Sequence, residues 1–198
     1  MENMITTPCC ECGKEMKGRI ENYRYSECGL GSVVLKNILV FHCSSCGGAM
    51  PQLTAAKDLH KLIALRLLRK KSLLNGEEVR FLRKFSRFSQ IELANSLGAH
   101  KTQVSQWETG LKKLTNRTDR LVRLTFLMRM TSEALSTAPN DHLSSEALVD
   151  IQQMLDQVQG NLQDKKLMEG ETNQQYVIDP ATLGSLVDRS VETSRLVH

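Results

Sequence analysis

The chain has 198 residues and a net charge of +4, with 40% hydrophobic but only 5% aromatic side chains. This length is enough for one ordinary domain or two small ones, and no run of about 18 apolar residues could span a membrane. The first residues contain no apolar signal core, so we expect a cytoplasmic protein whose paired cysteines bind metal rather than form disulfides.

Two Cys-x-x-Cys pairs near the N-terminus have the spacing of zinc knuckles: Cys9 with Cys12, and Cys43 with Cys46. Two intervening residues let one tight turn present both thiolates, and the glycine after each pair suits that turn because it accepts positive φ. Four thiolates would form a closed tetrahedral site, whereas catalytic zinc keeps an open position. The spacing therefore predicts a structural Zn²⁺ ion that does no chemistry.

Residues 19–26 and 33–42 alternate in polarity on either side of a glycine turn, which predicts a small antiparallel sheet between the knuckles. Such a segment has few apolar side chains, and a structural metal would supply the stability that its core lacks. We expect residues 1–50 to form a zinc-ribbon domain.

Two further cysteines lie outside the knuckle spacing. Cys10 could compete with Cys9 as a ligand, although the spacing to Cys12 favours Cys9. Cys28 lies in the predicted turn and is expected to be a spectator, as is His42, a surplus ligand beside the second knuckle. A redox-sensing function of Cys10 and Cys28 has no support in the pattern.

The middle of the chain is basic. Residues 57–123 contain sixteen basic and six acidic side chains, whereas residues 131–198 contain four basic and eleven acidic ones. This asymmetry is typical of a segment that binds a polyanion, but it also fits helices that are simply solvated. Within it, helical periodicity predicts a connector helix over residues 54–74, in a connector region of residues 51–75.

Three helices are predicted next, over residues 77–88, 90–97 and 101–108. Ser89 is a suitable N-cap for the second helix and Gly98 a suitable terminator, with only three residues before the third helix. Two short helices joined in this way are typical of a helix-turn-helix, whose second helix lies in the major groove of DNA. We expect the first two helices to bury the apolar residues Val79, Phe81 or Leu82, Phe85, Ile91, Leu93, Ala94 and Leu97.

The third helix has one apolar and one polar face. Val104 and Trp107 are three residues apart and should pack inward. Any exposed helix has a polar face, but amide and ammonium groups also suit the edges of bases. The predicted base-reading residues are Lys101, Thr102, Gln103, Ser105 and Gln106.

A polar and basic cluster follows the third helix and could hold phosphates, which supply affinity without reading sequence. A fourth helix over residues 118–130 should bury Leu121, Leu124, Leu127 and Met128 and complete a domain of residues 76–130. The cluster consists of Lys112, Lys113, Asn116, Arg117 and Arg120.

The last segment, residues 131–198, is acidic and therefore a poor ligand for DNA. Apolar residues over 144–162 recur at alternating steps of three and four, which favours a two-heptad coiled coil that self-associates. Packing of one amphipathic helix against its own domain is the alternative. A last helix could begin at Asp179 and serve as a docking peptide.

Several of these motifs resemble known families. The run from Ser89-Gln90 through Leu97-Gly98, followed by Val104-Ser105-Gln106-Trp107-Glu108, resembles the Xre-type, phage-repressor-like helix-turn-helix. Together with the knuckles, residues 9–130 resemble the MqsA-like antitoxins, which have a YgiT-type zinc finger. The resemblance implies a homodimer on a palindromic operator, repression of its own operon, and a zinc domain that binds a toxin. It also implies that Gln90 contacts phosphate or a base, with Thr102, Gln103 and Gln106 reading bases.

The expected fold is mainly α, with a small N-terminal β zinc ribbon and a helix-turn-helix domain. No catalytic triad, paired carboxylates or phosphate loop appears in the sequence, so we expect no enzymatic activity. The expected function is a dimeric, sequence-specific regulator, most simply a repressor, that binds double-stranded DNA. The alternative is an antitoxin whose main partner is a toxin.

Overall fold

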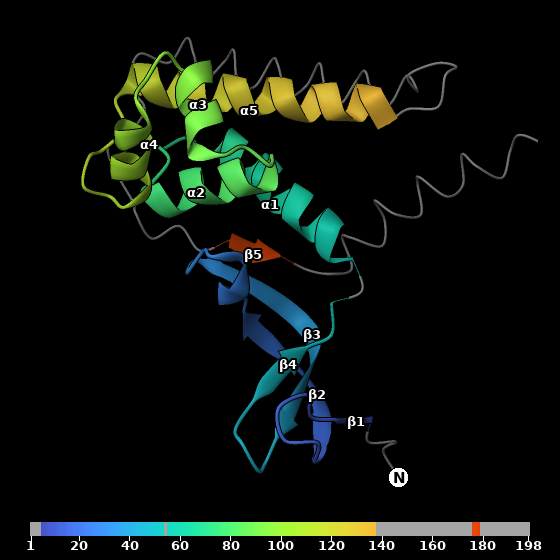
Figure 1. The fold of residues 1–198 in the computed structure, drawn as a ribbon. Helices are drawn as coiled ribbons and strands as arrows, with labels where there is room; N and C mark the ends of the chain where they lie inside the picture. The colour runs from blue at the N-terminus through green and yellow to red at the C-terminus, as the bar shows by residue number, and fades with distance from the viewer. Residues whose placement is uncertain (1–4, 54, 138–175, 179–198) are drawn as a thin grey trace, which may run out of the picture. The chain divides into compact units, whose positions relative to one another are not determined.

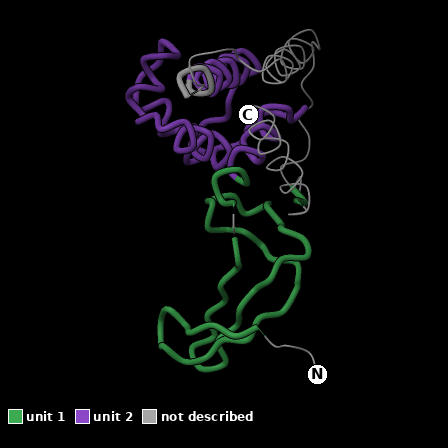
Figure 2. Tube along the Cα trace, turned by 90° about the vertical axis from the view of Figure 1, so that its right-hand side faces the viewer, with its two compact units in different colours: residues 1–59, 173–198 green, residues 60–172 purple. Residues whose placement is uncertain are grey.

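The computed structural model describes residues 5–53, 55–137 and 176–178, which fall into two compact units (Figure 2). The N-terminal unit comprises residues 1–59 together with 173–198, and the helical unit comprises residues 60–172. No helix in the described part of the chain is long and apolar enough to cross a membrane.

The N-terminal unit contains a sheet in which four strands follow the order β1-β2-β3-β4 (Figure 1). The long strands β2 and β3 are antiparallel, with Met16 opposite Cys43 and Arg24 opposite Val34, and a bulge interrupts their register between Glu21 and Tyr23. This confirms the predicted antiparallel sheet between the two cysteine pairs. The four strands are β1 (Thr6–Pro8), β2 (Glu15–Arg24), β3 (Val33–Cys43) and β4 (Ala49–Pro51).

A fifth strand, β5 (Tyr176–Ile178), comes from the far end of the sequence and pairs in parallel with β3. Tyr176 lies opposite Val33, and Ile178 lies opposite Leu35. We did not predict this strand. The coiled coil predicted over residues 144–162 and the helix predicted from Asp179 lie outside the described residues.

Two helices of the helical unit begin with a side-chain capping box at Asn75 and at Ser89. The Asn75 side-chain oxygen caps α2 by accepting a hydrogen bond from the Glu78 N–H. In return, the Glu78 carboxylate accepts a hydrogen bond from the Asn75 N–H. Ser89 and Glu92 form the same pair at the start of α3, which confirms Ser89 as the cap. The helices are α1 (Ala56–Arg69), α2 (Gly76–Phe85), α3 (Gln90–Ser96), α4 (Lys101–Glu108) and α5 (Asn116–Thr137).

Helix α2 ends at Phe85 and not at Phe88 as predicted. Arg87 adopts the left-handed conformation with φ 56°, and the Phe88 N–H donates back to the Arg83 carbonyl at 3.0 Å. This is a Schellman termination in which arginine takes the position that glycine usually occupies. Gly98, with φ 60°, terminates α3 in the same way, and that termination was predicted.

Helix α1 ends at Arg69, earlier than the predicted Leu74. The Arg123 guanidinium, which comes from α5, donates to the carbonyls of Leu67, Leu68 and Lys70 at 2.9 Å each. The Leu67 carbonyl also accepts from the Lys70 N–H at 3.2 Å. Carbonyls at the end of a helix lack the N–H donors of a following turn, so the Arg123 cation supplies donors where α1 ends.

The predicted buried face of α5 was partly wrong. Leu121 is 46% exposed and Met128 is 70% exposed, although Leu127 is buried. The face that packs inward instead carries two charged residues, Asp119 and Arg123. Helical periodicity places them on the same face as the apolar residues Val122 and Phe126. The prediction that Ile91 is buried is also wrong, because this side chain is 54% exposed. The inward residues of α5 are Asp119, Val122, Arg123, Phe126 and Leu127.

Candidate metal centre and nucleic-acid interface

The two cysteine knuckles have the same local backbone. In the first, the Gly13 N–H donates to the Cys9 carbonyl at 2.9 Å, and Gly13 has φ 71°. In the second, the Gly47 N–H donates to the Cys43 carbonyl at 3.0 Å, and Gly47 has φ 76°. The glycines are therefore required for these turns, because side chains are strained at such φ values.

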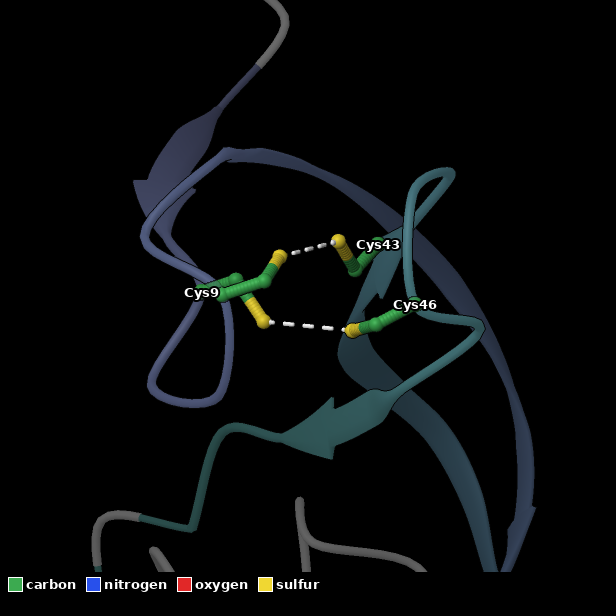
Figure 3. A group of neighbouring side chains, drawn as sticks. Cys9, Cys43 and Cys46 are labelled. Atoms are coloured by element: carbon green, nitrogen blue, oxygen red, sulfur yellow. Dashed lines mark hydrogen bonds between the residues drawn. The ribbon is translucent and has the colours of Figure 1, made fainter.

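The sheet brings the two knuckles together (Figure 3). The Sγ atoms of Cys9 and Cys46 are 3.6 Å apart, those of Cys12 and Cys43 are 3.4 Å apart, and all four lie within 4.8 Å of one another. Four ligands at about 2.3 Å from zinc would stand about 3.8 Å apart at the corners of a tetrahedron. None of the cysteines forms a disulfide. This group could therefore hold a metal ion, as predicted.

The thiols differ in how readily they ionise. Backbone N–H groups of Cys46 and Ser45 point at the Cys43 sulfur and lower its pKa to about 6. At Cys46 the Gly48 N–H lowers the pKa, but the adjacent Cys43 and Cys9 sulfurs together with desolvation outweigh it and raise the pKa to about 12. Four thiolates so close together repel one another, and a bound cation would compensate that repulsion.

The other candidate ligands lie outside the group. Cys10 is exposed, and the Cys28 thiol donates to the Tyr25 carbonyl at 3.0 Å. His42 Nε2 lies 2.9 Å from a Glu21 carboxylate oxygen on the neighbouring strand. The group that could hold a metal ion is therefore Cys9, Cys12, Cys43 and Cys46. Cys9 and Cys43 also pack with Met16 and Phe41 in a small apolar cluster.

Helix α4 spans the predicted residues Lys101–Glu108, and Val104 and Trp107 are buried as predicted. Lys101 and Thr102 are exposed, whereas the other three predicted base-reading residues are half-buried. Gln103 also caps its own helix, since its Oε1 accepts from the His100 N–H at 2.9 Å. Thr102 and Gln106 are therefore better placed than Gln103 to contact a ligand.

Glu108 was not predicted as an important residue, yet it holds α2, α3 and α4 together. Its buried carboxylate accepts from Arg83 Nε at 2.5 Å and from Gln90 Nε2 at 2.9 Å, and Arg80 Nε lies 3.9 Å away. Burial alone would raise the pKa of Glu108, but the hydrogen bonds from Arg83 and Gln90 and the nearby positive charges lower it. The side-chain amide of Gln90, which was predicted to contact DNA, thus donates its N–H to Glu108 of the same unit.

Gly76 is a second residue whose importance becomes evident only in the structure. A Cβ atom there would lie 2.5 Å from the Trp107 carbonyl oxygen and 2.8 Å from that of Glu108. The start of α2 and the end of α4 therefore pack backbone to backbone. The sequence signal is the Asn75-Gly76 pair, which as a pattern indicates only a turn or a helix boundary.

The predicted phosphate-binding cluster follows α4 on the loop to α5 and on its first turns. The Lys112 N–H donates to the Gln106 carbonyl at 3.1 Å, which folds the loop back against the end of α4. Arg120 is half-buried, and the remaining members, Lys112, Lys113, Asn116 and Arg117, are exposed.

Comparison with known proteins identifies no relative of this chain. No protein-family model matches it, and neither a curated protein nor a solved structure does so.

Proposed function

We propose that this protein is a zinc-stabilised, sequence-specific DNA-binding regulator that acts as a homodimer. In this proposal α3 and α4 form a helix-turn-helix, and α4 enters the major groove. The observation that carries it is the pairing of α3 and α4: a short turn at Gly98, a buried Val104–Trp107 face, and a polar opposite face next to a basic loop.

The hydrogen bonds of Glu108 support this function because base reading needs a rigid helix. Its carboxylate ties the end of α4 to Arg83 of α2 and to Gln90 at the start of α3. A recognition helix that moved relative to its neighbours would lose the bidentate geometry on which base discrimination depends.

Electrostatics supports the same proposal. Lys112, Lys113 and Arg117 are exposed on the loop that folds against α4, where they would contact phosphates on either side of the groove. Each such contact releases counterions, so affinity should fall steeply with salt, with a log–log slope of about −0.9 per phosphate neutralised.

The metal assigned to the four cysteines is zinc in this proposal, because an all-thiolate tetrahedral set is typical of structural Zn²⁺. All four positions are taken by protein, so the ion would stabilise the N-terminal unit and leave no site for a substrate. The sequence resemblance to MqsA-like antitoxins agrees with both the zinc-stabilised N-terminal unit and the DNA-binding helix-turn-helix of this proposal.

Dimerisation is supported by the exposed apolar residues of α5. Leu121 and Met128 are seven residues apart and thus lie on one face of the helix, where a symmetry-related copy would cover them. Two subunits would then present two α4 helices to a palindromic site.

The test replaces the two best-placed polar residues together, Thr102→Ala with Gln106→Ala. Loss of base contacts should reduce the preference for the selected operator over scrambled duplex by about 10-fold or more, with nonspecific affinity largely kept. Competition gel shifts measure this ratio. Gln52→Ala, an exposed amide in the N-terminal unit, is the matched control. An unchanged preference in the double variant would mean that α4 does not read the bases.

A further inference from the structure

The four-cysteine group has a buried side and an exposed side. The first cysteine of each knuckle is buried, with Cys9 at 5% and Cys43 at 3% exposure. The second cysteine of each knuckle, Cys12 or Cys46, is exposed to solvent. The open approach to the four sulfurs is therefore the side on which Cys12 and Cys46 lie.

A carboxylate of the first knuckle reaches across to the second. Glu11 directly precedes Cys12 in the sequence, and its side chain is exposed. A Cβ atom built on Gly48, just after the second knuckle, would lie 3.4 Å from Glu11 Oε2 and 3.4 Å from Cys46 Sγ. The carboxylate oxygen and the Cys46 sulfur thus flank the same point, and no more than twice that distance separates them.

The Glu11 carboxylate is available to a cation. In the part of the chain that the structure describes, it takes part in no ion pair or hydrogen bond. Carboxylate oxygens bind Zn²⁺ at about 2.0–2.2 Å, and zinc can pass from four ligands to five during a reaction. Glu11 therefore offers a fifth donor atom on the exposed side of a group whose four sulfurs would fill a tetrahedron.

We propose that Glu11 is the entry and exit ligand of this metal centre, which changes places with the Cys46 thiolate as a divalent cation binds or leaves. On exit, a metal–oxygen bond to Glu11 forms as the metal–sulfur bond to Cys46 breaks, with no change of oxidation state, and entry is the reverse. Glu11 should thus set the rate of metal transfer and not the final coordination. The inference rests on the proposed metal centre and is independent of DNA binding.

The test measures metal release from the full-length, zinc-loaded chain. Excess 4-(2-pyridylazo)resorcinol takes up the released ion, and its absorbance in a stopped-flow instrument gives the rate. Glu11→Gln should release zinc about 10-fold more slowly than wild type, the lower end of the effects seen when a group that supports a metal site is removed.

Two further variants separate ligation from charge alone. Glu15→Gln removes the same charge from an exposed residue at the start of β2, and it should release zinc as fast as wild type. Glu11→Asp keeps the charge on a side chain one methylene shorter, and it should be as slow as Glu11→Gln. Equal rates for wild type and Glu11→Gln, slow release from Glu15→Gln, or a wild-type rate for Glu11→Asp would each overturn the proposal.

Cobalt spectra provide the second readout. Saturated wild type and Glu11→Gln should give the same thiolate charge-transfer absorption, because four sulfurs hold the ion in both proteins. A changed spectrum in Glu11→Gln would make Glu11 a resident ligand and would overturn its role in transfer. Wild type without any thiolate–cobalt absorption would refute the metal centre itself, and this inference with it.

Discussion

Glu108 shows how one buried carboxylate can set the geometry of three helices. Its side chain is 2% exposed, and the carboxylate is stable there only because Arg83 and Gln90 donate to it. Sequence periodicity places residue 108 at the end of α4 but cannot show that it faces inward, since glutamate is usually exposed. The cysteine group was predictable because the Cys-x-x-Cys spacing indicates the turn by itself.

Replacing Glu108 with Gln should lower the free energy of unfolding by about 3 kcal/mol at pH 7, because Arg83 is left without its carboxylate. Urea denaturation measures the loss. Adding Arg83→Met to the same protein should recover part of the stability, since no unpaired charge then remains. A Glu108→Gln protein as stable as wild type would show that this ion pair does not hold the helices.

The pH dependence of stability follows from the lowered pKa of Glu108. A group with a depressed folded-state pKa stabilises the fold above its unfolded pKa, about 4.3 for glutamate. That stabilisation is lost as pH falls through the folded-state pKa. We therefore expect the stability difference between wild type and Glu108→Gln to shrink below about pH 4. A difference that stays constant from pH 7 to pH 3 would contradict this assignment.

At the scale of elements, the main feature that was not predicted is the set of hydrogen bonds from Arg123 of α5 to the end of α1, which we call the Arg123 latch. Arg123 donates to four carbonyls at the end of α1 and after it, including that of Ser72 at 2.8 Å, and pairs with Asp119 at 2.7 Å. Charged residues usually lie on the outer face of a helix, so the predicted core of α5 was placed at Leu121 and Met128 and not on the face of Asp119 and Arg123. Helix α4 was predicted correctly because its apolar spacing and flanking glycines agree.

Replacing Arg123 with Met should lower the free energy of unfolding by about 3–5 kcal/mol, because Asp119 and the α1 carbonyls lose a buried donor. Chemical denaturation followed by helical circular dichroism measures the effect. Arg117→Met, an exposed arginine at the start of the same helix, is the control and should stay within about 0.5 kcal/mol of wild type. Equal effects of the two substitutions would contradict the latch.

At the scale of the whole molecule, local signals predicted most elements but not the long-range ones. Strand β5 has three residues and pairs in parallel with a distant strand, so no periodicity could identify it. The antiparallel β2–β3 pair was predictable because its strands are close in sequence and joined by a glycine turn. The grouping of the four cysteines then follows, since Cys43 at the end of β3 lies opposite Met16 near the start of β2, just after the first knuckle.

Metal loading should govern the order of the N-terminal unit. Cobalt titration of the metal-free chain should give thiolate charge-transfer absorption with wild type and with Cys10→Ser, but not with Cys43→Ser. Binding should weaken as pH falls, because protons compete for the sulfurs that the metal requires as thiolates. Identical cobalt spectra for Cys43→Ser and Cys10→Ser would contradict the assigned ligand set.

The central claim is tested most directly by selecting the duplexes that the zinc-loaded chain retains from a random-sequence DNA pool. We predict enrichment of one palindromic site with half-sites about 10 base pairs, or a multiple of one helical turn, apart, as two α4 helices on a symmetric dimer require. A retained pool as random as the input, with no enriched half-site, would contradict the claim that this protein reads DNA sequence.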